Sequence, residues 1–252
     1  QTRPDDALTV SQVADLYRQN KMLKEAEELY AKAVELSPAD PQYREYLGEF
    51  LHIQKRPEEA LNVWKEIAAG SRRTALNITR LAEVYNSFGF PEKAVVEIAE
   101  AVTLDPKDFS LQIRAAEYHS RAGKFDEAMT YVAAADALAA SDDERDAVIQ
   151  QKVDVLQTSQ QLDAEADRLA NEIRDKSDAT VQDWYLLARY LEASRRWPDA
   201  TEAVDQALSL NAKSIPALAL AARIAETSGD YGRAADTSRK LAEIDRRSRG
   251  DH

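Results

Sequence analysis

The stretch that decides the fold is residues 76–106, LNITRLAEVYNSFGFPEKAVVEIAEAVTLDP. Two runs of helical periodicity flank Gly89, where a helix end favours the left-handed backbone conformation that Gly adopts without strain. Pro106 ends the second run, because proline cannot continue a helix. Ala82 and Ala94 lie one on each run, twelve residues apart. The stretch therefore predicts two helices joined by a tight turn.

The same pattern recurs along the chain. Small residues stand at the position of Ala94 in every unit: Ala26, Ala60, Ala94, Ala128, Ala166, Ala200 and Ala234. Successive members of this set are 34, 34, 34, 38, 34 and 34 residues apart. An internal repeat of this length predicts a stack of similar two-helix units.

Two further sets keep the same register. Twelve residues before these alanines stand Ala14, Gly48, Ala82, Ala116, Ala188 and Ala222. Four residues after them stand Tyr30, Trp64, Ile98, Val132 and Val204. Helix axes that pack within about 8 to 10 Å leave no room for a side chain larger than methyl at the point of contact. The small pairs therefore mark helix crossings, and the bulky residues fill the space one turn further on.

Turn and capping residues mark where the helices of each unit begin and end. Gly123 and Gly229 occupy the same turn position as the glycine of the first stretch. Asp40 precedes a proline and reads as a helix N-cap, and Ser141 with Glu144 three residues later reads as a capping box. These signals predict two helices per unit.

These residues resemble the tetratricopeptide repeat family, and the pattern is met best in Leu8–Pro38 and Leu76–Pro106. The resemblance implies an all-α, right-handed superhelical solenoid of about seven helix-turn-helix repeats. We expect one repeat domain over residues 1–252. Its repeats are expected at about 7–40, 41–74, 75–108, 109–142, 143–180, 181–214 and 215–248. Because the chain starts at Gln1 and its last helix is only partly polar, we expect it to be a segment of a longer protein.

The fifth unit departs from the pattern. Between Ser141 and Ser177 the small pair is lost, because the first position falls on Asp154 or Lys152 depending on register. About four residues are inserted in this unit. We therefore expect a longer helix or a local change of superhelical pitch near Ala133–Asp146.

Composition excludes several classes of protein. The chain has no cysteine, which excludes disulfides, thiol catalysis and cysteine-ligated zinc. The net charge of -12 disfavours binding to nucleic acid or anionic lipid. Hydrophobic residues make up 44%, enough for a continuous core. No apolar run reaches the roughly 20 residues that a membrane-spanning helix requires.

The resemblance implies that the first helix of each repeat lines a concave groove. Residues eleven before the repeated alanines are then expected to face this groove as a tentative partner-binding set: Asp15, Glu49, Glu83, Glu117, Arg189 and Arg223. The four acidic members would attract a basic segment laid along the groove. Tyr185 is expected beside Arg189 and completes the set, since an aromatic next to arginine is a common contact pair.

A second interpretation of the charges stays open. Each of four arginines stands three residues before a glutamate on its own helix: Arg80 and Glu83, Arg114 and Glu117, Arg189 and Glu192, Arg223 and Glu226. Such pairs can simply bond to each other on a solvated face. The spacing alone does not separate this interpretation from a binding groove.

No catalytic or metal motif is found. His52, His119 and His252 lie in different repeats, and no metal-ligand spacing surrounds them. The chain has no nucleotide-binding loop and no glycine-rich nucleophile elbow. Trp64, Trp184 and Trp197 are in register with the repeat and are expected in the core. We predict a protein that is not an enzyme and that uses no cofactor or metal.

The sequence therefore predicts a protein-protein interaction scaffold that binds a peptide or helical segment of a partner, expected to be basic, in its groove. One alternative is a regulatory or assembly module acting in cis within a larger protein. A less favoured alternative is a helical repeat that binds RNA, which the acidic row opposes. The sequence gives no cellular location.

Overall fold

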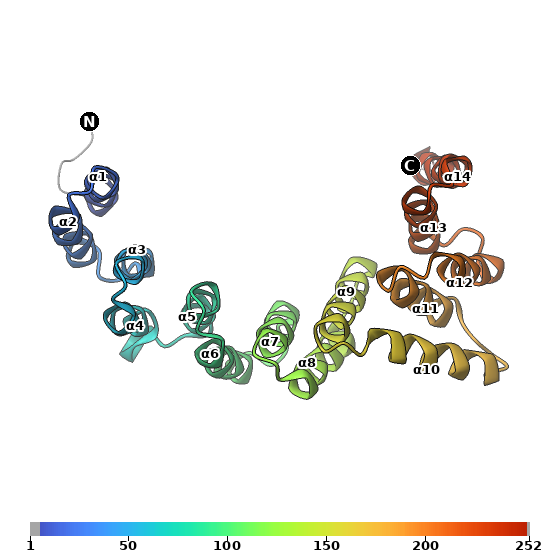
Figure 1. Ribbon diagram of the computed structural model, residues 1–252, viewed down its shortest axis with the longest axis horizontal. Helices are drawn as coiled ribbons and strands as arrows, with labels where there is room; N and C mark the ends of the chain where they lie inside the picture. Colours follow the sequence, from blue (N-terminus) through green and yellow to red (C-terminus); the bar gives the residue numbers. More distant parts are fainter. Residues whose placement is uncertain (1–5, 251–252) are drawn as a thin grey trace. The chain divides into compact units, whose positions relative to one another are not determined.

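The computed structural model describes residues 6–250, and over this range the backbone forms helices and turns without a strand. The chain divides into two compact units at Leu138/Ala139 (Figure 1). The helices of the first unit are α1 (Ala7–Gln19), α2 (Leu23–Leu36), α3 (Pro41–Ile53), α4 (Pro57–Trp64), α5 (Ala75–Ser87), α6 (Pro91–Leu104), α7 (Phe109–Arg121) and α8 (Phe125–Leu138). Two 3-10 turns, Lys65–Ala68 and Gly70–Arg72, follow α4. The prediction of an all-α fold of helical hairpins is confirmed.

The second unit continues the hairpin pattern. Its helices are α9 (Asp142–Thr158), α10 (Leu162–Asp175), α11 (Val181–Ala193), α12 (Trp197–Leu210), α13 (Ile215–Ser228) and α14 (Tyr231–Gly250). Odd-numbered helices are the first helices of the pairs, and even-numbered helices are the second. Each unit has its own buried core, from Ala14 to Tyr118 in the first and from Val153 to Ile224 in the second.

The capping residues act as the sequence predicts. The Asp40 side chain accepts a hydrogen bond from the backbone N–H of Gln42 at 2.9 Å, and α3 begins at the next residue, Pro41. Ser141 and Glu144 form the predicted capping box at the start of α9. These bonds satisfy N–H groups that the first turn of a helix leaves without a partner.

Close helix packing at the small pairs is also confirmed. Ala14, Ala82 and Ala26 are fully buried. At Gly48 the contact is tighter than a methyl group would allow, because an added Cβ would overlap the indole ring of Trp64. That ring is itself fully buried, and its Nε1 donates to the backbone oxygen of Glu45 at 3.3 Å. The large residue on α4 thus uses the space that the glycine on α3 leaves.

The fifth repeat needs a correction to its register. The hydrogen bond that closes each hairpin turn runs from Gln161 N–H to Leu156 O here, which matches Arg196 to Leu191 in the next repeat. Counted from this turn bond the equivalent position is Glu165, but the small residue that is fully buried in the core is Ala166, as predicted. The counterpart of the first small position is Val153, which is 3% exposed, and neither Asp154 nor Lys152.

The insertion itself lies in α9. This helix has 17 residues, whereas the other first helices have 13 or 14. The prediction of a longer helix near Ala133–Asp146 is confirmed, and the boundary between the two units falls in the same range. Within the second unit α10 packs chiefly on α11 and only slightly on α9.

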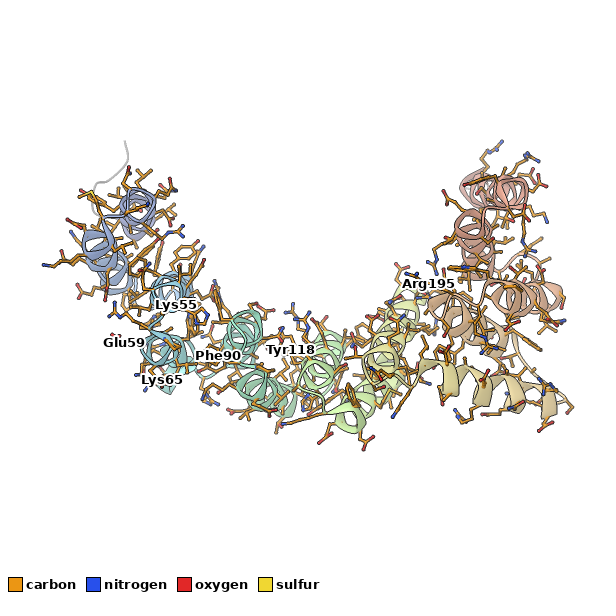
Figure 2. All side chains as sticks on the ribbon, in the orientation of Figure 1. Lys55, Glu59, Lys65, Phe90, Tyr118 and Arg195 are labelled. Carbon is orange, nitrogen blue, oxygen red and sulfur yellow. The ribbon has the colours of Figure 1, made fainter. Side chains whose placement is uncertain are left out.

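The turn between paired helices requires a positive φ in every repeat. Glycine supplies it at Gly89, Gly123 and Gly229, as predicted. Other residues adopt the same conformation at the equivalent positions: Lys21, Lys55, Gln160 and Arg195, with φ between 58° and 63°. Figure 2 labels two of them at their turns. The geometry of the hairpin thus imposes the left-handed conformation even where the side chain disfavours it.

Replacing Lys55 by Gly is expected to raise the free energy of unfolding by up to about 1 kcal/mol, because it removes the strain of a left-handed non-glycine residue. Lys65→Gly is the matched control, since Lys65 has helical backbone angles and the change should cost about 1 kcal/mol. Urea unfolding followed by circular dichroism measures both. Equal losses of stability in the two variants would contradict the assignment of strain to the turn.

Gly48→Ala is expected to lower the free energy of unfolding by about 1–3 kcal/mol, because the new methyl group displaces Trp64. Gly232→Ala in α14 is the control, because the nearest atom to its added Cβ lies 3.7 Å away. There the change should be neutral or slightly stabilising, as alanine favours helix. The same urea titration compares them, and a neutral Gly48→Ala would show that the indole can move aside freely.

Candidate functional site

A groove of about 860 Å³ lies in the first unit along the first helices α3, α5 and α7. Its lining combines apolar and charged side chains, and we call it the acidic groove. Its residues are Glu45, Tyr46, Glu49, Ala75, Leu76, Thr79, Arg80, Glu83, Val84, Ser87, Phe88, Asp105, Asp108, Ser110, Leu111 and Arg114. Figure 2 shows the side chains of these helices. The first helices thus line a groove, as the resemblance implies.

The groove has an apolar component that the sequence analysis did not single out. Leu76 is 78% exposed although it is a large aliphatic residue. It stands near the start of α5, whose N-cap Thr74 accepts a hydrogen bond from the backbone N–H of Asn77. Phe88 and Leu111 also line the groove. An exposed leucine in a concave site offers apolar surface to a ligand.

The arginines of the groove bond across helices. Arg80 on α5 pairs with Glu45 on α3, with one N–O distance of 3.1 Å, and Arg114 on α7 pairs with Glu83 on α5. Of the two interpretations left open by the sequence, pairing within one helix is therefore not the one that Arg80 and Arg114 follow. The long side chains reach the neighbouring repeat because adjacent first helices are packed side by side. These bonds tie successive repeats together.

Two carboxylates of the groove keep no such partner. Within the part of the chain that the structure describes, no cation lies within 4.0 Å of Glu49 or Asp105. Asp108 accepts from the backbone N–H of Leu111 at 3.1 Å as the N-cap of α7. The groove wall therefore has five carboxylates against two guanidinium groups, both already paired, and its excess charge is negative.

A smaller pocket of about 220 Å³ adjoins the acidic groove. It is lined by Asp15, Arg18, Tyr30, Tyr46, Glu49, Phe50 and Ile53. Tyr30 donates to Asp15 at 2.5 Å, and Arg18 donates to the same carboxylate at 3.1 Å. Burial and the bond to Asp15 raise the pKa of the Tyr30 hydroxyl well above its usual range. Asp15 and Glu49 of the predicted acidic row thus meet in one pocket.

The other two acidic residues of the predicted row, Glu83 and Glu117, do not line this smaller pocket. Glu83 lines the acidic groove but is paired with Arg114. Glu117 lines neither the groove nor the smaller pocket, and it pairs with Arg121 one turn later on α7 at 2.7 Å. The structure therefore brings Asp15, Glu49 and Glu83 to the two hollows and leaves Glu117 outside them.

In the second unit the predicted residue Arg189 is buried. Only 4% of its side chain is exposed, and it bonds Asp146 and the Gln150 side chain on α9, the latter at 2.7 Å. Tyr185 lies beside it, as predicted: its hydroxyl donates to Asp146 at 2.7 Å and accepts from Arg189 at 3.2 Å. Burial and the bond to Asp146 raise the pKa of Tyr185. This cluster holds α11 against α9.

Arg223 also bonds across helices. It pairs with Glu192 on α11 at 2.5 Å and 2.7 Å, so the predicted pair of Arg223 with Glu226 is not formed. Arg189 approaches the same glutamate at 3.7 Å, which is the one predicted same-helix pair that the structure shows. Both arginines of the predicted row are thus paired with carboxylates.

The structure describes no cluster of metal-binding side chains among residues 6–250. His119 is 7% exposed, its Nδ1 lies 2.8 Å from the backbone oxygen of Ala115, and burial lowers its pKa. His52 packs against Trp64 and Phe88. His252 lies outside the described residues. No helix in the described range is both long and apolar enough to cross a membrane.

Glu45, which the sequence analysis did not name, could have been found by comparing residues on one face of its helix. Glu45 stands one helical turn before Glu49, so the two share a face of α3. Tyr46 and Leu76 carried no signal of their own, because their exposure depends on which neighbours cover them.

Paired helices stacked into a core, with a groove along the first helices, define a helical-repeat protein. Residues 12–72 match the family model described as tetratricopeptide repeat. The hairpin of these residues recurs in both units, with its closing turn bond and its positive φ. Residues 12–72 are therefore assigned to tetratricopeptide repeats, and the other hairpins share their turn geometry. Proteins of this family are generally non-catalytic scaffolds for protein interactions.

Solved structures with a similar chain path include a tetratricopeptide repeat protein from Parabacteroides merdae, at 14% identity and a TM-score of 0.45, covering 94% of this chain and 93% of that one. The pilF protein of Pseudomonas aeruginosa has 16% identity and a TM-score of 0.39, covering 94% and 91%. The C-terminal part of a repeat protein from Cytophaga hutchinsonii has 14% identity and a TM-score of 0.43, covering 93% and 95%. No curated protein matched the chain.

Asp146→Asn is expected to lower the free energy of unfolding by about 1–3 kcal/mol, because it removes the nearest charged partner of the buried Arg189 guanidinium and leaves only Glu192, at 3.7 Å. Asp142→Asn on the same helix is the control, since Asp142 pairs with Arg145 on an exposed surface and should cost at most about 0.5 kcal/mol. Chemical unfolding measures both. Equal effects would show that the Arg189 cluster adds no stability beyond a surface pair.

Proposed function

We propose that this protein is a non-catalytic scaffold that binds an extended or helical segment of a partner protein in the acidic groove. The family supports a role in protein interaction, and the groove supplies a place for it. The observation that carries the proposal is the combination of an exposed leucine and an unpaired glutamate within one groove, Leu76 and Glu49.

The shape of the groove favours a peptide segment as the ligand. Three parallel first helices present equivalent positions at successive repeats, so a chain laid across them meets a new set of side chains at each helix. The volume of about 860 Å³ is within the range of sites that hold several side chains of a ligand. The apolar surface of Leu76 and Phe88 would supply affinity through burial.

The charge of the groove favours a basic or neutral segment. Glu49 and Asp105 are free to pair with a ligand, whereas Arg80 and Arg114 are already bonded to glutamates. An acidic segment or a phosphate backbone would meet repulsion here. A segment with cationic side chains would be steered to the groove, with an effect that falls as the salt concentration rises.

Replacing Leu76 by the photoreactive residue p-benzoylphenylalanine tests the proposal in a native cell extract. Irradiation is expected to join the groove to one defined segment of a partner, which peptide mass spectrometry identifies. Val96 on α6 is the matched control position, because it is also exposed, at 63%, and lies outside the groove.

The expected result is a partner segment that is cross-linked from position 76 and absent from position 96. The same products from both positions, or none from position 76, would contradict binding in this groove. Adding the Glu49→Lys change to the reactive protein should reduce the yield, because it reverses the free charge of the groove.

A further inference from the structure

The smaller pocket beside the acidic groove has a composition that suits one kind of side chain. Helices α1, α2 and α3 contribute Asp15, Tyr30 and Glu49 to it. We propose that this pocket is the subsite for a single cationic side chain, arginine or lysine, of the bound partner segment, and that Glu49 selects it. The inference rests on the proposed function and adds the chemistry of one ligand residue.

The carboxylates of the pocket have unused capacity for hydrogen bonds. Both bonds to Asp15, from Tyr30 and from Arg18, end on Oδ1. Among the described residues none donates to Asp15 Oδ2 or to either oxygen of Glu49. A carboxylate that is partly removed from water and has no partner is stabilised when a cation comes within reach. A ligand cation would therefore find two oxygen-bearing groups from two helices.

The remaining walls fit the rest of such a side chain. Tyr30, Tyr46 and Phe50 line the pocket, and the face of an aromatic ring attracts a guanidinium or ammonium group. Ile53 also lines it and is 47% exposed, so the aliphatic stem of lysine or arginine can pack there. A volume of about 220 Å³ is smaller than that of a typical small-molecule site, and it suits one side chain.

Arg18 pairs with only one of the two carboxylates in the pocket. Its guanidinium pairs with Asp15 at 3.1 Å and forms no ion pair with Glu49 within 4.0 Å in the described structure. The pocket therefore holds two carboxylates and one guanidinium, which leaves one negative charge. Arg18 also fixes the position of Asp15, so the charge that is free to respond to a ligand is that of Glu49.

The pocket is placed to act together with the groove. Tyr46 and Glu49 line both hollows, so the two are continuous along α3. A segment that rests on Leu76 in the groove can direct a neighbouring residue into the pocket. The partner segment is thus expected to combine an apolar residue with a cationic one.

A displayed library of random twelve-residue peptides tests the inference with the full chain as bait. Peptides enriched on the wild type are expected to contain arginine or lysine next to apolar residues. An enriched peptide, labelled for fluorescence anisotropy, is expected to lose affinity about tenfold on Glu49→Gln, which keeps the shape and removes the charge. Glu117→Gln is the control, because Glu117 lies outside both hollows, and it should change affinity less than twofold.

A second arm uses a neutral version of the peptide, with citrulline for arginine or acetyl-lysine for lysine. Wild type and Glu49→Gln should bind this version equally, because a neutral peptide cannot form a charge pair with either protein. Thermal unfolding of each variant verifies that the fold is unchanged.

Three results would overturn the proposal in distinguishable ways. Enriched peptides without basic residues would show that the groove binds peptides while the pocket does not select a cation. Equal losses for Glu49→Gln and Glu117→Gln would show a general effect of charge and no selection by Glu49. The absence of enrichment over a bare support would contradict the proposed function as well, and the subsite with it.

Discussion

Close approach of paired helices is the constraint on which the rest of this structure depends. A helix crossing with Ala or Gly on one side lets the facing residue be large, as Gly48 and Trp64 show. The interior then packs densely, and burying the apolar surface supplies most of the stability. Since the same pair recurs in most repeats, each unit builds its core by adding one similar hairpin after another.

Arginines on the first helices add a second link between repeats. Arg80, Arg114, Arg189 and Arg223 each bond a carboxylate on the preceding first helix. These bonds connect neighbours that are about one repeat apart in sequence. They also decide which charges a ligand can meet, because a carboxylate that is bonded to arginine attracts other cations less. Glu49 keeps its charge available because no arginine of the described residues 6–250 pairs with it.

The repeat in the sequence is enough to predict the helical hairpins, their caps and their pairs of small residues. These features depend on local backbone preferences and on one contact that recurs in each repeat. This prediction was less successful at the fifth repeat. There Ala166 is buried as predicted, but the first small position is occupied by Val153 and by neither Asp154 nor Lys152. Counting residues cannot locate an insertion within a helix, since a longer α9 and a longer loop give the same spacing.

The sequence by itself determined the all-α repeat, the three glycine turns that need a positive φ, and the acidic face of the first helices. Only the tertiary structure decided which of those charges are free. Each long arginine side chain can pair with a glutamate on its own helix or with a carboxylate on the preceding repeat, and the distances between helices decide which pair forms. The same holds for Leu76, whose exposure follows from the absence of a covering neighbour and from nothing in its own residue type.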